Sequence, residues 1–259
     1  MRLILPSRAI VSTIAAATLL LTCAGLRAEP VDELIKSGDA CDAKLQASEA
    51  LKFYLPAEKA KPQDPHLLTS LSRQYRHLMS DASSTSEKLK LGHIALSYAQ
   101  RAAVAGPKDA EAQLAPAITY GKMLPFEGKS EQLEASKHIK ESAEKAIKLD
   151  PHNDLAWHIL GRWYRVLADV GTVTRALASM IYGSLPPATN EQALKCFQKA
   201  IELNPHRLMH YVELGHVYAQ MGKGTEAKRY IQKGLAMTNT EKDDPETKQK
   251  GRELLASLR

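Results

Sequence analysis

Aromatic residues are scarce in this sequence: its 259 residues include two tryptophans, nine tyrosines and three phenylalanines. Strands in β-sandwiches depend on aromatic and β-branched side chains to cover their faces. Alanine, by contrast, is abundant, which suits helices that pack closely through small contact residues. The composition therefore favours an all-α fold.

Common signatures of catalysis are also missing. The chain has no nucleophile elbow, phosphate-binding glycine loop, zinc-binding histidine pair of the zincin type or CxxC motif. The run Gly222-Lys223-Gly224 lacks the pattern of a P-loop and predicts a turn between helices. We therefore expect a protein that binds a partner, with no enzymatic activity, no cofactor and no bound metal.

Cysteine is rare, with three residues in the whole sequence. Cys23 lies in the N-terminal segment, which leaves Cys41 and Cys196. An oxidising compartment would permit these two to form a disulfide. The alternative, two buried thiols on separate helices, is favoured because nothing in their spacing brings them together.

A strong charge of one sign is absent as well. The formal net charge is +6, but three of the arginines lie within residues 1–28, and the remainder holds 32 bases against 29 acids. An excess this small and dispersed does not predict nucleic-acid binding.

The N-terminal segment has the pattern of a secretory signal. Arg2 and Arg8 provide positive charge, residues 9–21 are mostly apolar, and small residues precede an expected cleavage after Ala28. A membrane anchor is the alternative, but the apolar stretch is short for a bilayer span. Lipidation at Cys23 is disfavoured by the threonine before it. We expect export to the periplasm or cell envelope.

From residue 29 to residue 259 one spacing pattern recurs. A proline is preceded five residues earlier by alanine and followed ten residues later by a small residue and thirteen later by tyrosine. The proline–tyrosine pairs are Pro62/Tyr75, Pro107/Tyr120, Pro151/Tyr164 and Pro205/Tyr218. The small residues are Ser72, Ala117, Gly161 and Gly215. Since proline cannot continue a helix, each pair predicts a turn followed by a helix that crosses its partner closely at the small residue.

The second helix of each unit carries small or apolar residues at i, i+4 and i+7, which form one helical face. They are Ala50/Tyr54/Ala57, Ala95/Ala99/Ala102, Ile139/Ala143/Ala146, Ala193/Phe197/Ala200 and Ala227/Ile231/Gly234. These triplets predict five helix–turn–helix units in a right-handed solenoid of the tetratricopeptide type.

Insertions interrupt the regular period of this solenoid. Successive repeat prolines are 45, 44 and 54 residues apart, whereas the standard period is about 34 residues. We expect polar loops at residues 80–87, with a helix cap at Ser86, and at residues 124–130. The longest insert, 168–190, contains an apolar helical stretch. A final helix, capped by Asp243 and Asp244 and running to Leu258, is expected to close the stack.

The region 146–258 resembles a specific family. Trp157-His-Ile-Leu-Gly-Arg-Trp163 is followed by an insert and then by Leu-Pro-Pro-Ala-Thr at 185–189. These motifs are similar to those of the regulator of microtubule dynamics family. The resemblance implies a tetratricopeptide-like fold and a partner-binding protein. Trp157 and Trp163 fall on repeat positions and are expected in the core.

In solenoids of this type, defined positions of each first helix face the concave side. Those predicted to contact a partner are His66, Arg73, Arg76, His77, His158, Arg162, Arg165 and His216. Arginine suits carboxylates and phosphates, so the expected ligand is an acidic peptide, the C-terminus of a polypeptide or an anionic headgroup. The alternative is that these arginines are solvated or paired within the solenoid with acids such as Asp154 and Glu213.

A metal site is a further interpretation of the histidines. The pair His206 and His210 has helical i, i+4 spacing, and His152, His158 and His216 are further candidates. No Cys, Asp or Glu completes a ligand set at tight spacing, so metal binding is not predicted.

The leading functional hypothesis is a scaffold that holds a protein or peptide in its concave groove. A second hypothesis is a carrier of lipid or another apolar ligand, with the apolar residues 173–181 lining or closing a pocket. A third is a microtubule-associated protein, which requires an uncleaved N-terminus. Contact with a membrane is expected only through an uncleaved or lipidated N-terminus.

Overall fold

The computed structural model describes residues 30–171 and 187–258, and within these ranges the protein forms helices and no strands. The expected leader, residues 1–28, and the apolar stretch 173–181 lie outside the described residues. The helices are α1 (Val31–Asp42), α2 (Ala47–Ala60), α3 (Pro65–Asp81), α4 (Thr85–Ala105), α5 (Ala110–Met123), a 3-10 turn η1 (Leu124–Phe126), α6 (Lys129–Leu149), α7 (Asp154–Ala168), α9 (Asn190–Leu203), α10 (Leu208–Gln220), α11 (Gly224–Ala236) and α12 (Asp244–Ser257).

The helices pair as the repeat predicts: α1 with α2, α3 with α4, α5 with α6, α7 with α9, and α10 with α11. Each repeat proline lies in the turn between units. Two residues after it, Asp64, Asp109 and Asn153 accept hydrogen bonds from the backbone of the helix that follows. Such caps satisfy amide groups that the first helical turn leaves unpaired. The fifth unit differs, because Arg207 occupies this position and makes no cap.

Small residues lie where the two helices of a unit cross. A Cβ added at Gly161 would lie 3.1 Å from Cys196 Cβ on α9, and one added at Gly215 would lie 2.5 Å from Ile231 Cγ1 on α11. Three of the four repeat tyrosines fill the adjacent space by stacking on a ring of the second helix. These stacked pairs are Tyr75–Tyr98, Tyr120–His138 and Tyr218–Tyr230. The sequence prediction for the crossing is therefore confirmed.

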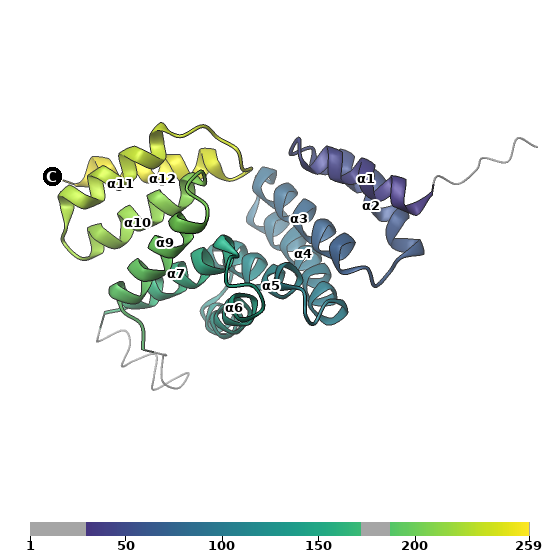
Figure 1. The fold of residues 1–259 in the computed structure, drawn as a ribbon, viewed down its shortest axis with the longest axis horizontal. Coiled ribbons are helices and arrows are strands. Elements are labelled where there is room, and N and C mark those ends of the chain that lie inside the picture. Colours follow the sequence, from purple (N-terminus) through teal and green to yellow (C-terminus); the bar gives the residue numbers. More distant parts are fainter. Residues whose placement is uncertain (1–29, 172–186, 259) are drawn as a thin grey trace, which may run out of the picture.

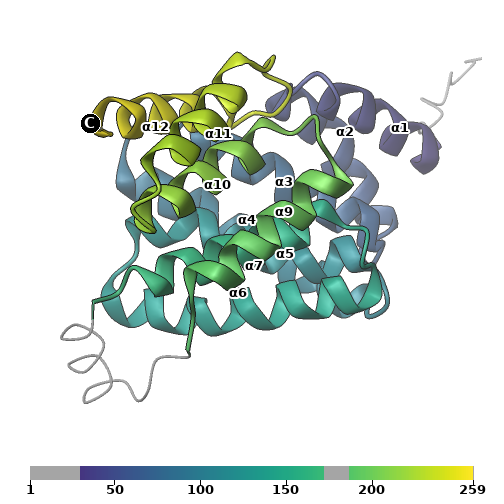
Figure 2. The same ribbon diagram turned by 60° about the vertical axis from the view of Figure 1, so that its left-hand side comes forward.

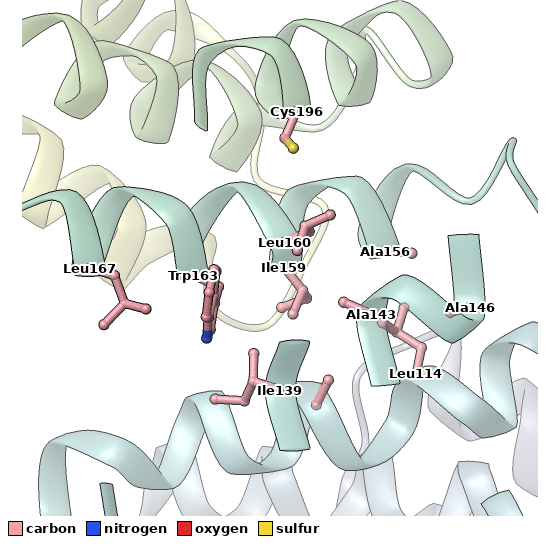
Figure 3. Packing of buried hydrophobic residues seen from close by; sticks show 11 residues of the cluster. Leu114, Ile139, Ala143, Ala146, Ala156, Ile159, Leu160, Trp163, Leu167 and Cys196 are labelled. Atoms are coloured by element: carbon pink, nitrogen blue, oxygen red, sulfur yellow. The ribbon is translucent and has the colours of Figure 1, made fainter. Parts of the chain in front are cut away.

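The largest apolar cluster surrounds α7, which lies between α9 on one side and α5 and α6 on the other (Figure 3). Trp163 is buried there and its indole N–H donates to the backbone oxygen of Ser136 at 2.9 Å. Trp157 is partly buried against the same cluster and donates to Pro151 O. Trp163 is a core residue, as predicted, whereas Trp157 packs at the edge of the core. Burial of such large side chains is a main source of stability in helical stacks.

Two insertions differ from their prediction. The expected loop 80–87 is mostly helical: α3 continues to Asp81 and α4 begins at Thr85. Ser84, not Ser86, caps α4, because its hydroxyl lies three residues before Glu87 and accepts that amide at 3.2 Å. At 124–130, η1 and the start of α6 likewise replace most of the loop. The additional residues lengthen helices, which keeps their backbone groups hydrogen-bonded.

The stack is strongly curved (Figures 1 and 2). The first helices α1, α3, α5, α7 and α10 contact one another in succession, whereas the second helices of the described units make no comparable contacts with each other. First helices therefore line the inner, shorter side of the arc. Curvature brings the segment between α11 and α12, at the top of Figure 1, close to the C-terminal end of α3.

The helix that closes the C-terminal end is present as predicted, with α12 packed on α10 and α11. Gly251 lies against Val212 and Ile231 and closes the end of the stack. Leu254 and Leu255 are half-buried.

Cys41 and Cys196 are both free thiols, one on α1 and one on α9. Among the described residues, no helix has the length and hydropathy of a membrane span.

Candidate partner-binding surface

The inner surface is formed by the first helices α1, α3, α5, α7 and α10, together with the segment after α11. Its charged residues fall into two groups. The N-terminal group is Asp42, Arg73, Arg76, His77, Lys122 and Asp243. The C-terminal group is Asp154, His158, Arg162, Arg165, Arg207, His210 and Glu213.

In the N-terminal group, Arg73 is paired and Arg76 is not. Arg73 Nη1 lies 2.8 Å from Asp42 Oδ2 of α1. Arg76 is 7% exposed, and its Nη1 donates to two neutral oxygens, Ser72 Oγ at 2.9 Å and Thr119 Oγ1 at 3.2 Å. Burial lowers the pKa of Arg76 to about 10, so the guanidinium remains charged at neutral pH. Among residues 30–171 and 187–258, no carboxylate lies in hydrogen-bond contact with this guanidinium.

Lys122, at the end of α5, is held by an acid from the far end of the sequence. Its Nζ lies 2.6 Å from Asp243 Oδ2, and Ser80 Oγ donates to Asp243 Oδ1 at 2.9 Å. Burial raises the pKa of Asp243, but Lys122 outweighs this and holds it below its usual value. A second ion pair joins Lys242 to Asp81 at 2.7 Å. Residues 237–243, here called the clasp, thus connect the fifth unit to the second and third units.

The clasp corrects one sequence expectation. The sequence predicts that Asp243 and Asp244 cap the final helix, yet the carboxylate of Asp243 makes no capping hydrogen bond. It is directed instead at α3 and α5. Asp244 is buried and accepts the amides of Thr240 and Glu241 at 2.7 and 2.8 Å, which shapes the turn that presents Asp243.

In the C-terminal group, two arginines share one carboxylate. Arg165 Nε lies 2.8 Å and Arg162 Nε 3.3 Å from the two oxygens of Glu213 on α10. Burial raises the pKa of Glu213, but the two arginines reverse the effect and hold it well below its usual range. The sequence alternative, pairing within the solenoid, therefore describes Arg162 and Arg165. One carboxylate cannot balance two guanidinium groups, so the region keeps positive charge.

Two buried histidines join the fourth and fifth units. His158 Nδ1 and His210 Nδ1 are 2.9 Å apart, and His210 Nε2 lies 2.8 Å from Asp154 Oδ2. Since one of the two facing nitrogens must accept, both rings cannot be charged there together. Burial lowers the pKa of both histidines, and Asp154 partly opposes this at His210. Arg207 forms ion pairs with the same carboxylate, at 3.0 Å, and with Glu241 of the clasp, at 3.4 Å.

The remaining predicted contact residues differ in accessibility. His66 is exposed and lies 3.2 Å from Asp39. His77 and His216 are half-buried, and burial lowers the pKa of His77 to about 4. His158 is 3% exposed and therefore acts within the core. The structure brings Arg73, Arg76 and His77 together on α3, and Arg162 and Arg165 together on α7.

Among residues 30–171 and 187–258 there is no group of three or more His, Cys, Asp or Glu residues arranged to hold a metal ion. His210 is committed to Asp154 and His158 rather than to a site shared with His206.

Sequence reasoning did not predict several residues of this surface, among them Arg207, Ser80 and Asp243. Arg207 carries a detectable signal, because an arginine stands where three other units have a capping Asp or Asn. Ser80 and Asp243 are 163 residues apart and carry no such signal. Their contact depends on the curvature of the entire stack.

Comparison with known proteins identifies the family. The family model for regulator of microtubule dynamics proteins 1–3 matches residues 29–259. The chain belongs to this family. Regulator of microtubule dynamics protein 2 of Mus musculus is 24% identical over 220 residues, which are 85% of this chain and 50% of the relative. Protein 1 of the same species is 28% identical over 232 residues, covering 88% of this chain and 75% of the relative. The chain thus spans about half the length of the first relative.

Solved structures related to this regulator of microtubule dynamics family member confirm the fold. A thermophilic TPR protein of Thermus thermophilus superposes with a TM-score of 0.61 at 17% identity, covering 88% of this chain and 98% of that one. The fold shared with that protein is a stack of helical hairpins of the tetratricopeptide type.

Proposed function

We propose that the protein is a non-enzymatic scaffold that binds an acidic peptide or protein segment along its inner surface. The observation that carries the proposal is the unbalanced positive charge of this surface. Arg76 is bonded to neutral hydroxyls, and Arg162 and Arg165 share one carboxylate. Guanidinium groups held in place by neighbouring helices bind carboxylates with little loss of side-chain entropy.

The structure indicates which arginine to test. Arg165 is mostly buried against Glu213, so changing it would damage the fold. Arg162 has a side chain 40% exposed and a longer contact of 3.3 Å, which leaves it available to a partner. Arg162→Gln should reduce capture of the partner, while the Arg165–Glu213 pair preserves the packing of α7 on α10.

The experiment is a pull-down from cell extract in which wild type, Arg162→Gln and a control are compared. Arg229→Gln is a matched control, because Arg229 is an exposed arginine on the second helix α11. We expect a partner captured by wild type and by the control and depleted with Arg162→Gln. Equal recovery with all three proteins would contradict the proposal.

We also propose that the protein is exported and cleaved after Ala28. Support comes from the leader pattern and from the family match, which starts at residue 29 and leaves the leader outside the shared domain. N-terminal sequencing of the mature protein should begin at Glu29. A start at residue 1 or 2 would contradict export with cleavage and favour the alternative of a microtubule-associated protein.

A further inference from the structure

The contact between Asp243 and Lys122 has the chemistry of a ligand bound in a site. Lys122 Nζ and Ser80 Oγ hold the two oxygens of one carboxylate, at 2.6 and 2.9 Å. The side chain of Lys122 is 17% exposed, so its ammonium group is poorly hydrated and requires an anion. Asp243 supplies that anion from outside the two units, those of α3 and α5, that form the site.

The surroundings of this carboxylate hold more positive charge and more donors than Asp243 uses. Arg76, on the same helix as Ser80, donates to neutral hydroxyls and has no carboxylate partner in the part of the chain that the structure describes. His77 Nδ1 is buried and has no hydrogen-bond partner in the described structure. The site at the C-terminal ends of α3 and α5 is therefore built for an anion.

Asp243 itself is attached in a way that permits exchange. It lies on a linker between helices rather than inside one, and its side chain is 48% exposed. The neighbouring pair Lys242–Asp81 is also largely solvent-accessible on the acid side, at 56%. Because the acid of each pair is accessible to water, each pair contributes less to stability than one that is buried on both sides. Glu213, by contrast, is fixed within a helix between two arginines.

We propose that Ser80, His77 and Lys122 form a carboxylate-binding site that Asp243 fills in the free protein and that a carboxylate of a bound peptide takes over. The inference rests on the proposed scaffold function and deepens it by naming an anchor point. Exchange would release the clasp from α3 and α5 and join this site to the remainder of the inner surface. The clasp then competes with the bound peptide for this site.

The test uses the purified protein and short fluorescent peptides at about 50 mM salt, where charges are weakly screened. One peptide alternates aspartate with glycine and is amidated. A second alternates asparagine with glycine and has a free C-terminal carboxylate, and a third is the same neutral sequence amidated. Binding is measured by fluorescence anisotropy with wild type, Asp243→Asn and the double variant Lys122→Gln/Asp243→Asn.

If Asp243 fills the site about nine-tenths of the time, its removal should raise the apparent affinity about tenfold. We expect this gain with Asp243→Asn and its loss in the double variant. The gain should appear with the first peptide if aspartate carboxylates bind, and with the second if the C-terminal carboxylate of a peptide binds. Glu202→Gln removes an exposed ion pair with Lys199 on α9 and should match wild type. Circular dichroism verifies that each variant is folded.

Equal affinity of wild type and Asp243→Asn for every peptide would overturn the proposal. So would a gain that persists in the double variant, since the lysine would then not be the anchor. Arg162→Gln separates this inference from the proposed function. Peptide binding that needs Arg162 but not Lys122 refutes the carboxylate site and keeps the scaffold function. Binding that needs Lys122, with partner capture indifferent to Arg162, keeps the site and refutes the arginine surface.

Discussion

The two charged groups of the inner surface hold their acidic residues in different ways. In the C-terminal group, Glu213 and Asp154 belong to helices and are enclosed by arginines and histidines of adjacent units. In the N-terminal group, the acid that meets Lys122 is on a linker and half-exposed. The acids of the C-terminal group are thus part of the core, whereas the acid that pairs with Lys122 in the N-terminal group makes a removable contact. A site that exchanges its own acid for a ligand requires the second arrangement, because an acid fixed in the core cannot make way for a ligand.

Glu213→Gln should produce the largest effect on stability. It leaves two arginines facing a neutral amide, and removing one partner of a buried pair typically costs about 3–5 kcal/mol of unfolding free energy. Because Glu213 is 16% exposed, we expect a loss toward the lower limit, about 2–4 kcal/mol. Urea unfolding at neutral pH measures it. Glu202→Gln, on an exposed pair, should change the free energy by less than about 0.5 kcal/mol. Equal losses would show that the C-terminal group is not part of the core.

Acidification should produce the next largest effect. The pKa values of His158 and His210 are lowered in the folded protein, so below the unfolded value of about 6.5 the unfolded state binds more protons. The stabilisation is complete above that pH and decreases as the pH falls, by up to about 1.4 kcal/mol per pH unit for each histidine. His158→Gln should reduce the slope between about pH 6 and pH 5 by one such contribution. An unchanged slope would contradict the burial of a neutral His158.

Asp243→Asn should be milder than Glu213→Gln. The variant loses an ion pair to a mostly buried lysine but keeps a polar side chain beside Ser80, so we expect a loss of about 1 kcal/mol. Hydrogen exchange should show faster exchange in residues 237–243 than in α10, because the clasp opens locally. A loss as large as that of Glu213→Gln would mean that the two groups do not differ and that the clasp is part of the core.

Lys242→Gln should have the smallest effect. Its pair with Asp81 is 2.7 Å long but lies where Asp81 is 56% exposed. Such pairs contribute between zero and about 1 kcal/mol, and we expect less than about 0.5 kcal/mol here. Urea unfolding of Lys242→Gln beside Asp243→Asn measures the difference. If Lys242→Gln were the more damaging of the two, Lys242 rather than Asp243 would be the main attachment of the clasp.

The repeat could be predicted from the sequence because its determinants are local. Pro151, Gly161 and Tyr164 recur with fixed spacing, and each acts within its own helical pair. The predictions of the cap of α4 and of the end of α3 were wrong, because a serine-rich run offers several capping residues and helix propensity competes with loop formation. Such boundaries depend on which residue first satisfies a free amide.

The candidate surface was predictable only in part. Positions on the first helices identified Arg73, Arg76, Arg162 and Arg165, since facing follows from helical periodicity. Their partners were less evident. Glu213 was predicted as an acid that pairs within the solenoid, whereas the pairing of Lys122 with Asp243 joins residues 121 positions apart. No local pattern encodes such a contact.

The helical pairs, their order and the inward positions of the first helices follow from the sequence, because proline turns, small crossing residues and apolar periodicity act over a few helical turns. Which of the inward charges remain available depends on the packing of the units against one another. Small rotations from unit to unit add up along the solenoid, and their sum brings Asp243 to the end of α5. That sum is a property of the packed stack as a whole, so the clasp and the site it fills emerge only when every unit is in place.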